Sequence, residues 1–164
     1  MSAILSLMQT APSNTTDPVK NKDTVPDCFY RVSIKALILD STRTKFMIVK
    51  ETNGKWELPG GGLDWGQTPQ TDLPREIAEE MGLETMLVAD RPSYFITFRH
   101  DRTGTWCANV LYEASVRDFD IVPSRECSEI RFIKPSEVPE TAYSNLVEFA
   151  KHFDPVNHKP ANHV

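Results

Sequence analysis

Three glutamates in the middle of the chain are spaced so that a helix would bring their carboxylates together. Glu76, Glu79 and Glu80 stand at i, i+3 and i+4, which places them on one helical face. Like charges this close repel and cost an isolated helix about 0.2–0.5 kcal/mol per pair. A cation would turn that repulsion into attraction, and oxygen ligands suit a hard divalent metal such as Mg²⁺. The spacing predicts a metal-binding helix, with a solvated charged face as the simpler alternative.

Three consecutive glycines, Gly60 to Gly62, precede this segment and predict a turn whose backbone can approach a metal or a phosphate closely. Hydrolysis of a phosphoanhydride needs neutralised phosphate charge, an activated water and a positioned leaving group. Carboxylate-bound Mg²⁺ supplies the first and lowers the pKa of a water for the second. The glycine turn and the glutamate helix together therefore favour phosphoanhydride hydrolysis.

The stretch from Gly61 to Leu83 resembles the box that defines the Nudix hydrolase family, G-x5-E-x7-R-E-U-x-E-E-x-G-U, in which U is aliphatic. Eight of the nine specified positions agree when Arg75 is aligned with the arginine of the pattern. The ninth is Gln67, which stands where the pattern has glutamate. The matching residues are Gly61, Arg75, Glu76, Ile77, Glu79, Glu80, Gly82 and Leu83.

The resemblance implies a fold and a cofactor. The fold is a Nudix-type α/β/α sandwich, in which helices flank a mixed β-sheet, and Ile77 and Leu83 are expected in its core. The cofactor is Mg²⁺, with Mn²⁺ as the alternative metal. The expected ligands are the backbone carbonyl of Gly60 and the side chains of Glu76, Glu79 and Glu80.

The resemblance also implies roles in catalysis and substrate binding. Arg75, Glu76 and Glu79 are the expected catalytic residues, with Arg75 orienting the carboxylates through charge-assisted pairs. A surface ion pair of little energetic value is the alternative for Arg75. The expected substrate-binding residues are Gly61, Gly62 and Gln67.

Two residues depart from what this activity requires. Gln67 can hydrogen-bond but carries no charge. Thr68–Pro69 predicts a helix start, with a capping residue and then proline at the first helical position. Pro74 would then lie inside the helix, without the N–H that should bond to Gln70, at a cost of ~3 kcal/mol. Alternatively, Asp72 caps a later helix and Pro74 falls within its first turn.

The general base is left open by the sequence. Glu76 and Glu79 are candidates within the box. The family resemblance adds a glutamate from a distant loop, for which Glu126 and Glu129 qualify, with solvated loop acids as the alternative. His100, at the tip of an expected hairpin, is either exposed or close to substrate.

The leading interpretation is Mg²⁺-dependent hydrolysis of a phosphoanhydride in a nucleoside diphosphate linked to another moiety, such as a nucleoside triphosphate or a nucleotide sugar. A nucleotide-binding or regulatory module without catalysis is the alternative, motivated by Gln67 and Pro74. A purely structural domain is the third. The clustered carboxylates favour the enzyme, because a module freed from catalysis has no physical need for three repelling charges.

The composition of the chain argues against several other classes of function. With 164 residues, 40% apolar and 25% charged, the chain is expected to form one domain. The net charge of −5 argues against a general nucleic-acid surface and favours a small-molecule nucleotide as partner. No apolar run approaches the ~20 residues of a membrane span, and the start is a poor signal peptide. The scattered Cys28, Cys107 and Cys127 are typical of reduced thiols in a cytoplasmic protein. The sequence is compatible with a homodimer and does not determine the oligomeric state.

Hydrophobic periodicity gives the order strands, box helix, strands, final helix, which is an α/β arrangement with helices beside a mixed sheet. The first strand alternates, with Arg31, Ser33 and Lys35 expected on a wet face. The final helix is expected to bury Tyr143, Leu146, Val147, Ala150 and Phe153. The expected strands and extended segments cover 29–40, 45–51, 56–58, 85–99, 106–116 and 130–133, and the final helix covers 141–153. A flexible arm (1–27) and a flexible tail (154–164, with His158 and His163) are expected around a domain at 28–153.

Overall fold

The long strand β6 (Trp106–Val116) is the centre of the fold, and three other strands pair with it. The computed structural model describes residues 28–158. Strand β1 (Arg31–Leu37) runs parallel to β6, whereas β5 (Tyr94–Arg99) and β4 (Thr85–Val88) run antiparallel to successive parts of it. This four-stranded sheet is mixed, as the sequence predicts.

A second, antiparallel sheet has the strand order β3-β2-β7. Its strands are β3 (Trp56–Glu57), β2 (Phe46–Lys50) and β7 (Glu129–Ile133). A short bridge between Leu39 and Phe46 connects the end of β1 to the start of β2. The two sheets are therefore joined through consecutive strands rather than through a helix.

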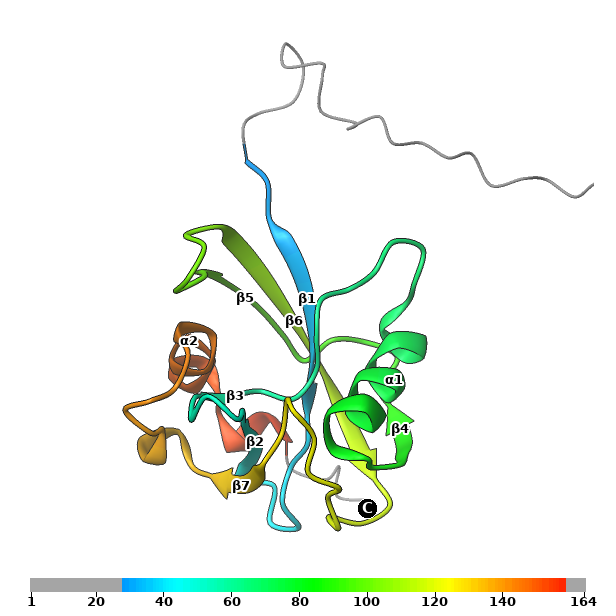
Figure 1. The fold of residues 1–164 in the computed structure, drawn as a ribbon. Helices are drawn as coiled ribbons and strands as arrows, with labels where there is room; N and C mark the ends of the chain where they lie inside the picture. The colour runs from blue at the N-terminus through cyan, green and yellow to red at the C-terminus, as the bar shows by residue number, and fades with distance from the viewer. Residues whose placement is uncertain (1–27, 159–164) are drawn as a thin grey trace, which may run out of the picture.

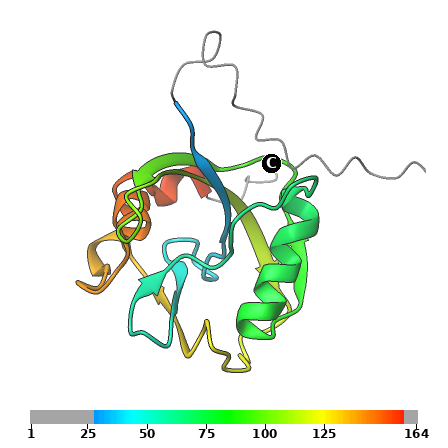
Figure 2. The same cartoon turned by 45° about the horizontal axis from the view of Figure 1, so that its top comes forward.

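The two helices lie on opposite sides of the sheets (Figure 1). Helix α1 (Pro69–Met81) contacts β1 and β4, whereas α2 (Ser144–His152) contacts β5 and β3. The turned view keeps the same arrangement, with the sheets between the helices (Figure 2). The expected sandwich is confirmed. Two 3₁₀ turns complete the described chain, Pro135–Glu137 and Pro155–His158. Neither helix of this part of the chain is long and apolar enough to span a bilayer.

Each helix has its own core. The core under α1 is aliphatic, and the helix contributes Leu73, Ile77 and Met81 to it. The core under α2 is aromatic, with Phe46 at its centre, 4.9 Å from the ring of Phe149. The core positions expected for Ile77 and Leu83 are confirmed, since both side chains are buried, and Trp56 is buried as well.

Most element boundaries match the sequence predictions to within a few residues, and β6 matches fully. The extended segment expected over 85–99 is two strands, because the turn around Pro92 separates β4 from β5. The wet face expected for the first strand is wrong at Lys35, which is buried. The reason is an ion pair with Glu57, at 2.6 Å, that lets the ammonium lie inside the protein.

The final helix is rotated relative to the expected stripe. Val147 is 41% exposed, and Phe149 takes the buried place instead. Leu146, Phe149 and Phe153 form the buried stripe, at i, i+3 and i+7, on the side of the helix that contacts β5.

The expectation of a flexible tail from residue 154 is wrong for its first part. His158 is buried, and its ring stacks on Phe153 with centroids 5.3 Å apart. Its Nε2 and the hydroxyl of Tyr94 share a 2.6 Å hydrogen bond. The arm expected at 1–27 and the tail residues from 159, including His163, lie outside the described residues.

Candidate active site

Helix α1 starts and ends where local chemistry dictates. Thr68 precedes the helix in an extended conformation, and its N–H donates to the hydroxyl of Thr71 at 3.1 Å. Pro69 occupies the first turn, where its missing N–H costs nothing. Gly82 ends the helix with φ +70° and donates to the carbonyl of Ala78 at 2.9 Å. Of the two helix starts that the sequence allows, the structure has the one at Thr68.

Pro74 therefore lies inside the helix, past the first turn. It cannot donate to the carbonyl of Gln70, so one helical hydrogen bond is missing. Asp72, the alternative cap, is buried instead, and Arg75 donates to its Oδ1 through Nε at 2.9 Å. The glutamates of the box follow Pro74 and keep their shared face.

The glycine turn lies against β1, which fixes its position. The N–H of Ile34 donates to the carbonyl of Gly61, and that of Ala36 donates to Pro59, both at 2.9 Å. Gly60 has φ +109°, and a Cβ there would lie 2.6 Å from the carbonyl oxygen of Ile34. Only glycine fits this position, because any side chain would both strain the backbone and collide with β1.

Two of the three box glutamates face the turn. The Oε2 of Glu80 accepts a hydrogen bond from the N–H of Gly60 at 3.0 Å. The carboxylate of Glu76 lies so close to Gly61 that a Cβ there would overlap it. Burial raises the pKa of Glu80 to about 7; Lys35 and the Gly60 N–H oppose this shift, and Glu57 and Glu76 add to it. The turn and the helix thus hold two carboxylates beside exposed backbone.

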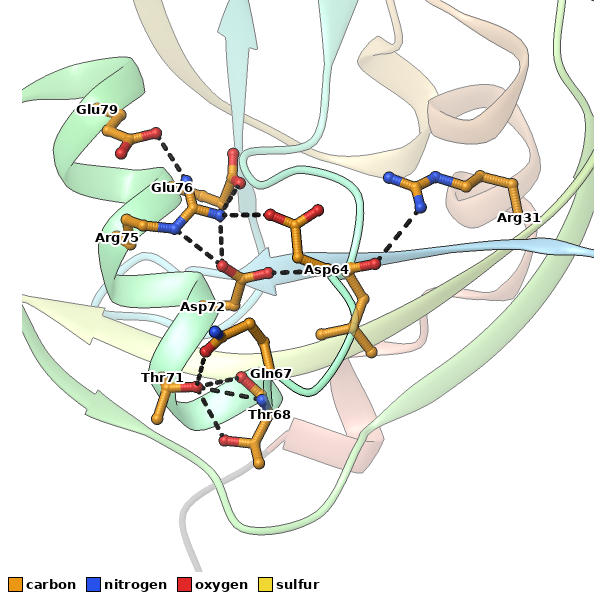
Figure 3. A network of polar contacts seen from close by, with 10 residues as sticks. Arg31, Asp64, Gln67, Thr68, Thr71, Asp72, Arg75, Glu76 and Glu79 are labelled. Carbon is orange, nitrogen blue, oxygen red and sulfur yellow. Dashed lines mark hydrogen bonds and ion pairs between the residues drawn. The ribbon is translucent and has the colours of Figure 1, made fainter. Parts of the chain in front are cut away.

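Arg75 holds three carboxylates of α1 together, those of Asp72, Glu76 and Glu79 (Figure 3). It donates to Glu76 Oε1 at 2.6 Å and to Glu79 Oε2 at 2.8 Å, in addition to Asp72. Hydrogen bonds to these acids raise the pKa of Arg75, Asp72 first and Glu76 second, so it stays charged. Glu79 is 59% exposed and points to this arginine rather than to the glycine turn.

A buried lysine supports the turn from the other side. Lys35 donates to the carbonyl of Gly60 and pairs with Glu57. Burial alone would lower the pKa of Lys35, but Glu57 and Glu80 outweigh it, and the pKa is raised. A charged lysine therefore lies within the acidic site.

These groups border a pocket of about 660 Å³. Glu76, Glu80 and the three glycines lie at one end, and residues of β1, β5 and β6 form a wall that includes Arg31 and Asn109. The guanidinium of Arg31 covers Gly62, where a Cβ would collide with it. The polar face predicted for the first strand is thus the wall of the pocket.

The loop before β7 brings one of the two candidate acids to the pocket. The hydroxyl of Ser124 donates to the carbonyl of Glu80 at 2.7 Å and accepts from the N–H of Glu126 at 3.0 Å. Glu126 lines the pocket. Glu129 is on β7 and pairs with Lys50 and Arg131 instead.

Two other candidates have local roles. Gln67 is exposed, accepts a 3.3 Å hydrogen bond from Thr71, and does not line the pocket. His100 lines the pocket, and its Nδ1 accepts from the N–H groups of Arg102 and Thr103 at 3.2 and 3.3 Å, which fixes the hairpin turn.

Sequence reasoning did not select three groups of this site. Arg31 and Lys35 were visible only as polar members of an alternating strand. Asn109 is a single amide within the apolar run of β6, and that contrast is the signal that could have identified it.

The donor atoms suit a hard divalent cation. The carbonyl of Gly60 has a second lone pair besides the one used by Lys35, and Glu76 and Glu80 lie beside it. Among the described residues, no group of three or more acidic, histidine or cysteine side chains is arranged to hold a metal ion. Mg²⁺ is usually bound through one or two carboxylates, with substrate phosphates and water completing its ligands.

Comparison with known proteins gives a consistent picture. The sequence profile of the NUDIX domain matches residues 29–153. An RNA pyrophosphohydrolase from Sulfurovum sp. (strain NBC37-1) is 25% identical over 134 residues, which cover 79% of this chain and 84% of that protein. A MutT-like protein from Streptomyces ambofaciens is 37% identical over 54 residues, covering 33% of this chain and 35% of that one.

The fold has close counterparts among solved structures. The MutT protein from Methanosarcina mazei Go1 superposes with a TM-score of 0.65 at 22% identity, covering 81% of this chain and 99% of that chain. At this identity the likeness concerns the fold, and it extends over almost the whole of the other protein.

Proposed function

The chain belongs to the NUDIX domain family and is a Nudix hydrolase, and we propose that it cleaves a phosphoanhydride bond in a nucleoside diphosphate linked to another group. This class includes nucleoside triphosphates and nucleotide sugars. The observation that carries the proposal is the placement of Glu76 and Glu80 against the glycine turn, at one end of a pocket that also presents Arg31. The relative named as an RNA pyrophosphohydrolase supports the same bond type.

The residues that would hold Mg²⁺ or Mn²⁺ are the carbonyl of Gly60 and the carboxylates of Glu76 and Glu80. Glu79 can join them only if its carboxylate leaves Arg75 and binds the metal instead. When bound, the ion would neutralise phosphate charge and lower the pKa of a water. The mutual repulsion of the carboxylates supports this assignment, since a cation removes it.

The remaining steps fall to groups of the chain itself. Arg31 lies over the glycine turn and can pair with the phosphates, for which a planar guanidinium is well suited. Glu79, which pairs with Arg75 rather than with the glycine turn, is the first candidate for the base. Glu126, fixed to the end of α1 through Ser124, is the second candidate for the base.

The test is a turnover assay of the full chain with Mg²⁺, Mn²⁺ or a chelator. The substrates are nucleoside triphosphates, nucleotide sugars, dinucleoside polyphosphates and RNA with a 5′-triphosphate, and the readout is release of phosphate, pyrophosphate or nucleoside monophosphate. We expect metal-dependent turnover on at least one class. Nucleotide binding by calorimetry without release from any of them would replace the hydrolase with a binding module.

A further inference from the structure

The wall of the pocket contains a buried amide that residues 28–158 leave unpaired. Asn109, on β6, has 0% exposure, and neither Oδ1 nor Nδ2 has a hydrogen-bond partner among residues 28–158. Buried amides are nearly always hydrogen-bonded, because an unpaired amide loses hydration without replacement. The described residues therefore provide neither a donor for Oδ1 nor an acceptor for Nδ2 of this amide.

The register of the sheet sets the distance between this amide and the glycine turn. Asn109 is paired with Ser33 of β1 on one side and with Ile96 of β5 on the other. Ser33 in turn bridges to Gly62. Neighbouring strands are about 4.8 Å apart, so Asn109 lies two strand spacings, about 10 Å, from the backbone of Gly62. The separation suits a nucleoside whose phosphate lies at the turn.

The neighbours of Asn109 suit the same ligand. Phe98 of β5 lines the pocket and is paired with Cys107, two residues before Asn109 on the same face of β6. Diagonal neighbours of this kind lie about 7–8 Å apart, within reach of a flat ring between them. Arg31, also paired with Cys107, lies between this part of the wall and the glycines. Along the pocket the order is carboxylates, cation, then amide and aromatic ring.

We propose that Asn109 recognises the base of the nucleotide substrate. Its Nδ2 donates to an acceptor on the base edge, and its Oδ1 accepts from the adjacent donor, while Phe98 contacts the ring. Base edges present such donor–acceptor pairs, and asparagine binds adenine in this bidentate way. The inference rests on the proposed function, because that function places the phosphates at the glycine turn.

Binding requires a small rearrangement, since both polar atoms of Asn109 are covered in the structure. Arg31 can move at little cost, because its contact with the carbonyl of Leu63 is long, at 3.5 Å. Its guanidinium already lies over Gly62, where a phosphate at the glycine turn would pair with it.

The test compares Asn109→Leu with a matched control, Thr85→Val. Thr85 Oγ1, on β4 and away from the pocket, is also buried and unpaired among the described residues. Thr85→Val therefore also removes an unpaired buried polar group, but at a site outside the pocket. The probes are AMP, GMP, CMP, UMP and ribose 5-phosphate, which keeps the sugar and phosphate but has no base. Affinities for the full chain are measured by calorimetry with Mg²⁺ present.

We expect wild type and Thr85→Val to bind at least one nucleotide ten times or more tightly than ribose 5-phosphate. Asn109→Leu should lose this preference and keep its affinity for ribose 5-phosphate. Its melting temperature should stay the same or rise, because an unpaired buried amide is replaced by an apolar group of similar size. Asn109→Asp keeps the hydrogen-bond acceptor and loses the donor, so it should lose part of the preference for a nucleotide over ribose 5-phosphate. This variant replaces Asn109→Leu in the test if the leucine variant does not fold.

Several results would overturn the proposal. One is a base preference that survives Asn109→Leu, and another is a wild type without any preference. An equal loss of ribose 5-phosphate binding, or a clear fall in melting temperature in both Asn109 variants, would assign the amide a structural role, for example through a buried water. Because monophosphates have no phosphoanhydride, these results are independent of turnover. Hydrolysis without base preference contradicts only the role of Asn109, and base preference without hydrolysis contradicts only the hydrolase.

Discussion

The two helices flank the same sheets, yet their surroundings differ in how polar groups are paired. In the aromatic core under α2, the buried side chain of His158 has a partner, since it shares a hydrogen bond with Tyr94. In the pocket, which residues of both helices line, Glu80 is held beside two other acids, and Asn109 is unpaired within the described chain.

This difference separates a region built for stability from one that a ligand can complete. Aromatic rings fill the core under α2, and their polar neighbours are satisfied without help. The pocket keeps repelling charges and an unused amide, which are unfavourable in the free protein and favourable once a cation or a base pairs with them. Changes in the aromatic core should therefore alter stability, and changes in the pocket should alter activity.

The largest effect is expected from Phe149→Ala. Phe149 is fully buried and contacts the rings of Phe46 and Tyr94 at 4.9 and 5.2 Å, so its removal leaves a cavity. The free energy of unfolding should fall by about 3–5 kcal/mol. Val147→Ala, on the exposed side of the same helix, should change it by less than about 0.5 kcal/mol. Urea unfolding measures both, and an equal loss in the two variants would contradict the assigned core.

Activity should respond most to Glu76→Gln. The carboxylate next to Gly61 loses its charge at constant size, and turnover should fall about a hundredfold, or some 2.7 kcal/mol of transition-state stabilisation. Glu84→Gln, at an exposed acid just after α1 that pairs with Arg117, is the control and should leave turnover unchanged. Unfolding curves of both variants should resemble wild type. A Glu76→Gln protein with full turnover would remove this residue from the active site.

A smaller effect concerns pH and Glu80 in chelator-treated protein. Since burial raises its folded pKa from 4.5 to about 7, the folded state binds this proton more tightly than the unfolded state. The resulting stability is present in full below pH 4.5 and is lost as the pH rises to 7, by about 1–2 kcal/mol after allowance for partial exposure. Glu80→Gln should match wild type at pH 4 and exceed it at pH 8. Urea unfolding with EDTA at both pH values tests this, and a variant less stable than wild type at pH 8 contradicts it.

The smallest effect is expected from Gln67→Glu, which restores the charge of the family pattern. Gln67 is exposed and contacts Thr71, so the added charge is well solvated. Unfolding free energy should change by less than about 0.5 kcal/mol, and turnover by a few-fold at most. If the wild type showed no turnover and Gln67→Glu did, a glutamate at position 67 would be required for catalysis, and the active site would extend beyond the pocket.

What the sequence could predict depended on how far apart the interacting residues lie in the chain. The i, i+3, i+4 spacing of the box glutamates and the two candidate helix starts, Thr68–Pro69 and Asp72, depend on neighbours within one or two turns, so they could be identified from the sequence, and the structure has the start at Thr68. The hairpin before Trp106 was readable for the same reason, since Gly104 has the positive φ that its turn requires.

Residues with distant partners were not readable. Lys35 is buried because Glu57 arrives from another strand, and His158 is buried because Tyr94 lies across the fold. The division of labour between Glu76 and Glu79 also depends on tertiary contacts, since one faces Gly61 and the other faces Arg75. Periodicity places such residues on a face, but only the assembled sheets determine what covers that face.

The central position of β6 has a consequence for synthesis of the protein. Arg31 at the start of β1 is paired with Cys107, so the ribosome adds roughly 75 residues before the first strand meets its partner. At about 5–20 residues per second this takes on the order of 4–15 s. During that time β1 has an unpaired edge, and the wall that carries Asn109 does not exist. A nascent chain released before residue 106 contains the glutamate segment but no pocket, and its exposed strand is a target for chaperones or for aggregation.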